Sequence, residues 1–349
     1  MIKVLIVEDS PVIAEFLTHI LNSDPDIRVI GVVSNGEEVL EVVRDQKPDL
    51  ITMDIHLPKM DGFEITRRVM EMVPTPIVIV SGSMEIQEVT TAFRAMEAGA
   101  LAVVQKPSAI GHPTHEAMAK ELVQTVKLMS EVRVVKRWAK YPPKEVPTSI
   151  PSKVEIRQMP AEIKLVAIGA STGGPLALQT ILSRLPKDFS VPILVVQHMT
   201  AGFIQGFIEW LNQQSDLLIH AAVNGEPILP GHVYVAPDGF QMKLDGNRRI
   251  ALTQDEPENG LRPSISYLFR SIANIYGENA VGVLLTGMGK DGAEELKLMK
   301  EKGAMTIAQD KESSVIHGMP GEAIKLGAAT YILSPDKIAA MLVGLANKK

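Results

Sequence analysis

The chain has 349 residues, about twice the length of a typical domain, which favours two domains that each bury a hydrophobic core. Hydrophobic residues make up 46% and charged residues 22%, so most of the chain is predicted to fold, and the formal charge of -6 disfavours nonspecific binding to nucleic acid. The chain has no cysteine, which excludes disulfides, thiolate metal sites and cysteine nucleophiles.

The first ten residues, MIKVLIVEDS, pass from an apolar run directly into acidic residues. This pattern lacks the apolar region and cleavage site of a signal peptide. No apolar run approaches the roughly 18 residues that a membrane-spanning helix needs. We therefore expect a cytoplasmic protein that does not insert into a membrane.

In the first 130 residues, short β-branched runs alternate with helical patterns. The runs are almost continuously apolar, which is typical of parallel strands that are covered on both faces. We expect strands at residues 3–7, 28–33, 50–53, 76–80 and 101–104. Five βα units, and a first domain at residues 1–130, are predicted.

Polar side chains follow four of these strands, at the point where each strand ends. Glu8 and Asp9 follow the first strand and Asp54 the third, while Ser81 follows the fourth and Lys106 the fifth. In an open parallel sheet these ends share one edge. Three carboxylates there form a hard-oxygen site suited to Mg²⁺, and Asp54 would accept a phosphoryl group stabilised by the metal, Lys106 and Ser81. Acids and serines at loop ends also often cap helices. Capping is a good explanation for any one of the five residues taken alone, but a poor explanation for all five at the ends of neighbouring strands.

The segments that carry these residues resemble the receiver domain of two-component response regulators. They are residues 4–10, DIHLPKMDG at 54–62, Ser81 and residues 105–107. The resemblance implies a five-stranded sheet of flavodoxin-like order and phosphorylation by a histidine kinase. Such receivers usually carry Tyr or Phe three residues before the lysine, where this chain has Val103, so we expect a switch without an aromatic reporter.

A basic, proline-rich segment at residues 131–162 is predicted to be an extended linker between the domains. It combines five prolines with seven basic residues: Pro142, Pro143, Pro147, Pro151 and Pro160, with Arg133, Lys136, Arg137, Lys140, Lys144, Lys153 and Arg157. Only Trp138 and Tyr141 interleave aromatic groups, so support for nucleic-acid binding is weak. A hinge, or a docking site for a partner protein such as the kinase, is the preferred interpretation.

Residues 163–349 are predicted to form a larger, doubly wound, mostly parallel α/β domain. We expect strands at residues 164–168, 192–196, 232–236, 280–285 and 304–308. Residues 241–252 contain Asp245-Gly246 between two apolar-bearing arms, which predicts an antiparallel hairpin within this domain.

The segment VAIGASTGGP, residues 166–175, allows three interpretations of Ser171. A dinucleotide site would need a third correctly spaced glycine and an acid about 20 residues on, where the chain has Gln197 instead. Ser171 or Thr172 could also cap the next helix, since Pro175 is favoured in a first helical turn. A helix cap, however, does not require the several glycines that surround Ser171. As a nucleophile, Ser171 would stand on a tight strand-to-helix turn beside free N–H groups such as that of Gly173, which could form part of an oxyanion hole.

A serine nucleophile needs a base and an acid. His198 stands at the end of the next strand, on the same edge as Ser171, and Asp291 ends a glycine-rich loop after a later strand. Asp291 could instead cap the helix that follows it. The other histidines of this half are weaker candidates for the base: His220, His232 and His317.

The motifs of this half together resemble the catalytic domain of chemotaxis protein-glutamate methylesterases. They are GASTGGP, QHM with AGF, YVAP, TGMGKDGA and HGMPGEA. The resemblance implies hydrolysis of glutamate γ-methyl esters on the cytoplasmic helices of methyl-accepting receptors, needing no cofactor, with some members also deamidating receptor glutamines. It implies that Ser171 is the nucleophile, His198 the general base and Asp291 the orienting acid, with Thr172 and the backbone near Met288 beside the reacting carbonyl. It also implies that phosphorylation relieves inhibition by the receiver.

The chain departs from the family pattern at three positions. Leu261 and Ser266 stand where a histidine and an aspartate are usual, and Gln241 replaces a frequent histidine. These departures affect expected substrate contacts rather than the proposed triad. Two alternatives remain open at this stage: a predominant glutamine deamidase, and a binding module without catalysis that phosphorylation controls.

Overall fold

The structure is a computed structural model that describes residues 1–82, 85–132, 134 and 162–346. The chain divides into two compact units, Met1–Glu145 and Val146–Lys349. The predicted linker at residues 131–162 lies outside the described residues, except for positions 131, 132, 134 and 162. Each unit has its own sheet and its own helices.

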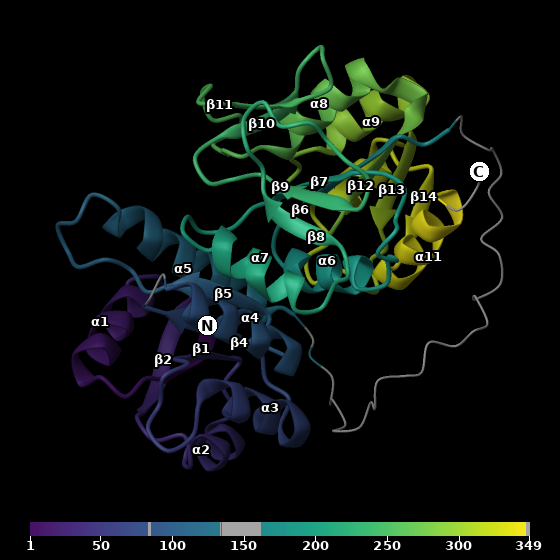
Figure 1. The fold of residues 1–349 in the computed structure, drawn as a ribbon. Helices are drawn as coiled ribbons and strands as arrows, with labels where there is room; N and C mark the ends of the chain where they lie inside the picture. Colours follow the sequence, from purple (N-terminus) through teal and green to yellow (C-terminus); the bar gives the residue numbers. More distant parts are fainter. Residues whose placement is uncertain (83–84, 133, 135–161, 347–349) are drawn as a thin grey trace. The chain divides into compact units, whose positions relative to one another are not determined.

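The first unit is a five-stranded parallel sheet with the order β2-β1-β3-β4-β5 (Figure 1). Its strands are β1 Ile2–Val7, β2 Ile27–Val33, β3 Leu50–Met53, β4 Ile77–Ser81 and β5 Ala102–Gln105. Its helices are α1 Pro11–Asn22, α2 Val39–Gln46, α3 Gly62–Met72, α4 Ile86–Ala98 and α5 His115–Ser130. This is the flavodoxin-like order, and the expected fold of the first unit is confirmed.

Burial explains why the strands of this unit have apolar sequences. All four residues of β3 are buried, as are the last four of β1, because helices cover both faces of the sheet. Edge strand β2 is buried only at its two ends, and its sequence includes Arg28 and Gly31. Helix α3 begins where it does because the Asp61 side chain accepts a hydrogen bond from the backbone N–H of Glu64, at 2.8 Å.

The second unit is built on a seven-stranded sheet with the order β14-β13-β12-β6-β7-β9-β8, and all six neighbouring pairs are parallel. Its strands are β6 Leu165–Ala170, β7 Ile193–Gln197, β8 Leu218–Ala221, β9 His232–Val235, β12 Ala280–Leu284, β13 Met305–Gln309 and β14 Tyr331–Leu333. Its helices are α6 Gly174–Leu182, α7 Ile204–Asn212, α8 Ile265–Ile275, α9 Ala293–Glu301, α10 Met319–Lys325 and α11 Pro335–Ala346, with a 3₁₀ turn at Gly277–Asn279.

The predicted hairpin is confirmed. Strands β10 Gln241–Leu244 and β11 Ile250–Thr253 form a separate antiparallel pair. Asp245 closes the turn between them, because its Oδ1 accepts hydrogen bonds from the backbone N–H groups of Asn247 and Arg249, each at 2.9 Å.

Two strands of the large sheet, β8 and β14, do not belong to the five that the sequence predicted. Both lie at the edges of the sheet, and β14 has only three residues. Leu218 of β8 is 55% exposed, so this strand has no reason to be continuously apolar. Edge strands that are short and partly exposed lack the pattern by which covered strands are recognised.

Helices cover both faces of the large sheet, which confirms the doubly wound architecture. Figure 1 shows α6, α7 and α11 on one face and α8 and α9 on the other. From β6 the chain continues to β7 on one side, while β12 pairs with β6 on its other side. The order therefore reverses at β6, and ligands of open α/β sheets bind beyond the carboxyl ends of strands at such a point.

Candidate functional site

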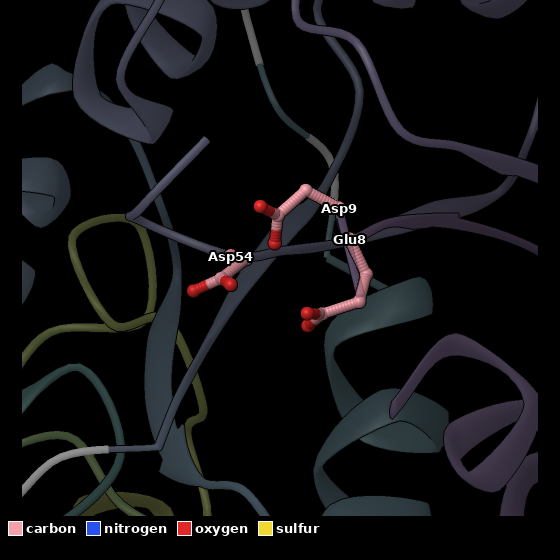
Figure 2. A group of neighbouring side chains, drawn as sticks. All are labelled: Glu8, Asp9 and Asp54. Atoms are coloured by element: carbon pink, nitrogen blue, oxygen red, sulfur yellow. The ribbon is translucent and has the colours of Figure 1, made fainter. Parts of the chain in front are cut away.

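Three carboxylates come together at the carboxyl edge of the first sheet. Glu8 and Asp9 follow β1 and Asp54 follows β3, and one oxygen of each lies within 4.8 Å of the others (Figure 2). Glu8 is 2% exposed and Asp54 6% exposed, whereas Asp9 is exposed. These oxygen donors are of the kind that Mg²⁺ prefers in proteins.

Lys106 joins this group from the end of β5. Its Nζ lies 2.8 Å from Glu8 Oε2 and 2.8 Å from Asp54 Oδ2. Burial raises the pKa of Glu8, and the neighbouring Asp54 charge raises it further, although the contact with Lys106 opposes both effects. Three carboxylates and one ammonium leave two formal negative charges in this largely buried cluster, which a divalent cation would balance.

Ser81 and Val103 occupy the neighbouring strands. Ser81 is the last residue of β4 and is 1% exposed, and its Oγ has no hydrogen-bond partner within the described residues. A buried hydroxyl without a partner is costly, so this oxygen is suited to hydrogen-bond a group bound beside it. Val103 lies on β5, paired with Ile79 of β4.

At the second sheet, Ser171 stands between β6 and α6, at the point where the strand order reverses. Its backbone N–H donates to Thr286 O at 3.0 Å, and its carbonyl accepts from the N–H of Gly174 at 2.8 Å. The turn needs glycine at position 173, which has φ +78°, a value that L side chains rarely adopt. A Cβ on Gly287 would lie 2.5 Å from Ser171 Cβ, so the Ser171 turn packs directly on that backbone.

His198 lies beside the same edge, directly after β7. Its backbone N–H donates to Ala170 O at 2.9 Å, which holds it next to the end of β6. Its side chain is 11% exposed, and its Nε2 lies 3.0 Å from Asp291 Oδ2. Nε2 makes no hydrogen bond of acceptable angle to any described residue, so its contact with the Asp291 carboxylate is close but poorly directed.

Asp291 is 5% exposed and reaches this point from the loop after β12. Its carboxylate lies at the start of α8 and accepts three hydrogen bonds there, from Ser264 Oγ at 3.0 Å, Ile265 N at 2.7 Å and Ser266 N at 3.2 Å. Burial alone would raise the pKa of Asp291, but the contact with His198 and the donors of α8 outweigh burial and lower the pKa to about 2. The carboxylate is therefore ionised and fixed in orientation.

The alternative interpretation of Asp291, a cap of the helix that follows it, is wrong. Helix α9 begins after Gly292, and no side chain among the described residues caps it. Asp291 binds instead the N-terminus of α8, an element that precedes it in the chain by about 25 residues.

Three backbone N–H groups near Ser171 remain free to bind a ligand. Those of Thr172, Gly173 and Met288 donate no hydrogen bond to any described residue. The carbonyl of Thr172 accepts from Thr286 Oγ1 at 2.9 Å, which holds the turn in place. The Met288 side chain is 48% exposed.

The other histidines have different surroundings. His220 Nε2 lies 3.3 Å from Glu226 Oε2, and its ring packs edge-on against Tyr234. His232 is the first residue of β9, at the opposite end of the strands from Ser171. His317 is nearer the site, because its backbone pairs with Gly287, but the only hydrogen bond of its ring among the described residues is to Ser314 Oγ, at 3.3 Å.

Several residues that hold the site together were not expected to do so. Gln241 is fully buried, and its Oε1 accepts from the N–H of Ser264 at 2.8 Å. Ser264 caps α8 and also donates to Asp291. Ser266 accepts from Gly292 N at 2.9 Å, so two of the departures from the family pattern support the carboxylate. A serine before an apolar helical run signals the helix start, but no sequence signal identifies its partner in a distant loop.

Comparisons with known proteins place both units in described families. Residues 166–342 match the family described as CheB methylesterase, and residues 4–116 match the response regulator receiver domain. A Nitrosospira multiformis protein described as protein-glutamate methylesterase/protein-glutamine glutaminase is 58% identical over 349 residues, which cover 100% of this chain and 98% of that protein. A Syntrophus aciditrophicus protein of the same description, numbered 1, is also 58% identical, over 99% of each chain.

Among solved structures, the CheB methylesterase catalytic domain of Thermotoga maritima is similar to the second unit. It is 39% identical, with a TM-score of 0.52, and the match covers 53% of this chain and 100% of that domain. In the part of the chain that the structure describes, none of the helices has both the length and the apolar character needed to cross a membrane. Because the family match spans most of the second unit and two relatives are 58% identical over nearly their whole length, this chain belongs to the CheB methylesterase family and carries a response regulator receiver domain.

Proposed function

We propose that this chain is a phosphorylation-activated serine hydrolase that removes methyl groups from glutamate γ-methyl esters on methyl-accepting chemotaxis-type receptors. The observation that carries the proposal is the contact of His198 with an ionised Asp291 at the sheet edge where Ser171 directly follows the adjacent strand, β6. A serine, an imidazole and a carboxylate so placed are the groups that acyl transfer needs.

In the proposed reaction the Ser171 hydroxyl attacks the ester carbonyl while His198 takes its proton. Asp291 contacts Nε2 of the ring, and Nδ1 has no partner among the described residues, so Nδ1 is the nitrogen left to accept this proton. The proton then passes to the departing methoxide, and methanol leaves. Water, activated by the same imidazole, next hydrolyses the acyl-enzyme and regenerates the serine.

The negative charge that develops on the carbonyl oxygen needs hydrogen-bond donors. The N–H groups of Thr172, Gly173 and Met288 are suited to this role, because they have no acceptor among the described residues. Thr172 and Gly173 belong to the Ser171 turn, and Met288 follows Gly287, whose backbone packs on Ser171. One such donor contributes about 3–4 kcal/mol to transition-state stabilisation in other serine hydrolases. We assign the oxyanion hole to these groups.

The receiver would control this reaction. We assign the phosphoacceptor to Asp54, with Glu8, Asp9 and Asp54 as the ligands of Mg²⁺, which when bound would neutralise charge on the incoming phosphoryl group. Lys106 is already placed beside Asp54 to pair with the phosphoryl oxygens.

A histidine kinase and the cytoplasmic helices of the receptors are the proposed partners, which places the reaction in the cytoplasm. Ser81 would bind the phosphoryl group through its unpartnered hydroxyl. The proposed domains are residues 1–130 for the receiver, 131–162 for the linker and 163–349 for the esterase. The ester hydrolysis itself uses only side chains and backbone groups of the second domain.

A binding module without catalysis is not favoured, because all three reactive side chains are present and Asp291 is held by three hydrogen-bond donors and contacts His198. Glutamine deamidation is a second activity that we propose for the same residues, since the description of the relatives pairs it with methyl-ester hydrolysis. A deamidation would release ammonia in place of methanol.

The test is methanol and ammonia release from methylated receptor membranes by the full-length protein, with and without acetyl phosphate and Mg²⁺. We expect methanol release that the phosphodonor increases and that Ser171→Ala abolishes. The matched control is Ser183→Ala, because Ser183 is an exposed serine just past α6 in the same unit. Equal and negligible release from the native protein and Ser171→Ala would refute the esterase, and ammonia in excess of methanol would make deamidation the main activity.

A further inference from the structure

Gln197 connects the two residues that the proposed reaction uses first. It is the last residue of β7 and is 2% exposed. Its Nε2 donates to Ser171 O at 2.9 Å and to His198 O at 2.7 Å. One side-chain amide thus uses both of its hydrogens to bind the backbone of the nucleophile and the backbone of the base.

The orientation of this amide follows from its surroundings. With the amide turned over, its oxygen would face two carbonyl oxygens, which is repulsive, so the nitrogen must lie where it does. The amide oxygen Oε1 is buried with no hydrogen-bond partner within the described residues. A Cβ on Gly174 would lie 2.2 Å from Oε1, so the amide is also confined by the start of α6. A buried acceptor without a partner costs free energy. The two hydrogen bonds that Nε2 donates must offset this cost, so they are the main contribution of the side chain.

The sheet alone does not hold the two reacting residues together. The pairing of β6 with β7 ends at Ala170 and Gln197, so Ser171 and His198 lie just beyond the ladder. One backbone hydrogen bond, from His198 N to Ala170 O, extends the β6–β7 ladder on the β7 side. On the β6 side, the carbonyl of Ser171 is connected to β7 through the Gln197 amide.

We propose that Gln197 is a positioning residue that sets the distance between the Ser171 hydroxyl and the His198 imidazole. The proposal rests on the proposed function, because it requires these two groups to react with each other. A displacement of about 1 Å between reacting groups can cost about 10²-fold in rate, so loss of this connection has a measurable consequence.

The first variant is Gln197→Met, which keeps the length of the side chain and removes both donors. We would measure kcat and KM for methanol release by the full chain with acetyl phosphate and Mg²⁺, and also the rate at which a fluorophosphonate modifies Ser171. We expect kcat and the modification rate each to fall about 10- to 100-fold, with KM within about two-fold of native, because the substrate surface is unchanged.

The matched control for general destabilisation is Thr306→Val. Thr306 is a fully buried polar residue of β13, and its Oγ1 donates to Ala328 O at 2.6 Å, so its loss also leaves a buried carbonyl unpaired. It has no hydrogen bond to Ser171 or His198. We expect this variant to lose stability and to keep native kcat and modification rate.

A second variant, Gln197→Glu, keeps the proposal testable if the first does not fold. A carboxyl group in this buried place has a raised pKa, and only its protonated form donates a hydrogen bond, to one of the two carbonyls. The ratio of variant to native activity is therefore expected to be highest near pH 6 and to fall as pH rises and the group ionises. Because ionisation of a buried carboxyl group also destabilises the fold, urea unfolding at each pH shows whether the variant is still folded where its activity falls.

Native kcat and native modification rate in a folded Gln197→Met, or a pH-independent activity ratio for Gln197→Glu, would overturn the proposal. The fluorophosphonate measurement separates this outcome from failure of the proposed function. If the native chain releases no methanol but Ser171 reacts rapidly with the reagent and slowly in Gln197→Met, the substrate assignment fails and the positioning role stands.

Discussion

Replacing Asp291 with asparagine is expected to change the protonation of His198 as well as the charge of the site. Oδ1 of Asp291 accepts from Ser264 Oγ and Ser266 N, while Oδ2 accepts from Ile265 N and contacts His198 Nε2. An asparagine must put its NH₂ group at one of these positions. At Oδ1 it would face two donors, but at Oδ2 it would face one donor and the imidazole.

The less costly orientation therefore places the NH₂ group against Nε2, which must then act as an acceptor. The ring proton moves to Nδ1, the nitrogen that would receive the Ser171 proton, and the base is in the wrong tautomer. The same exchange lowers kcat about 10⁴-fold in well-studied triads, and we expect a loss of that size with KM little changed. One buried N–H, that of Ile265, also loses its acceptor, which costs about 1–3 kcal/mol of stability.

The assay is methanol release under saturating receptor, together with urea unfolding of Asp291→Asn and native protein. The matched control is Asp245→Asn, because Asp245 also accepts two backbone N–H groups but lies in the hairpin turn. We expect this control to keep native kcat. If Asp291→Asn retained more than about a tenth of native kcat, the tautomer argument would be wrong.

Three further outcomes follow from the same geometry. Gly287→Ala would place a Cβ 2.5 Å from Ser171 Cβ, so we expect at least a 10-fold slower reaction of Ser171 with a fluorophosphonate, while Gly246→Ala, whose Cβ would meet no atom of the described residues within 4 Å, should react at the native rate. Asp54→Asn should take up no acid-labile phosphate from acetyl phosphate, as read by a phosphate-affinity gel, and its methanol release should not respond to the phosphodonor; phosphate uptake by this variant would move the phosphoacceptor elsewhere. The pKa of Asp291 is lowered from 3.8 to about 2, so its ionised form contributes about 2 kcal/mol of stability that is fully present above pH about 4 and is lost as pH falls toward 2. Urea unfolding between pH 5 and pH 2.5 should show this loss, and an equal loss in Asp291→Asn would assign it to other groups.

The residue types of the site are visible in the sequence because each follows a recognisable strand. Glu8, Asp54, Ser171 and His198 all stand directly after runs that are apolar because the structure buries them on both faces. Parallel strands bring such positions to one edge, so their gathering can be predicted without knowing the strand order. The hairpin at β10–β11 was equally accessible, since Asp245-Gly246 marks its turn.

Other features depend on contacts that no local pattern encodes. The sequence leaves two interpretations of Asp291, an orienting acid or a cap of α9, and cannot show that its loop turns the carboxylate toward α8. Strands β8 and β14 were missed because partial exposure at the sheet edges removes the need for apolar residues.

From the sequence alone came the two α/β domains, the types of reactive side chain and the edge on which they lie, because strand burial and turn chemistry are local and repeat along the chain. Only the tertiary structure decided that Asp291 is held by α8 and that Gln197 joins Ser171 to His198. These hydrogen-bonded residues are separated by about 25 positions and come together only once the strands have paired in their final order. A hydrogen bond between distant segments produces no periodic pattern in the sequence of either segment, so the sequence alone does not predict it.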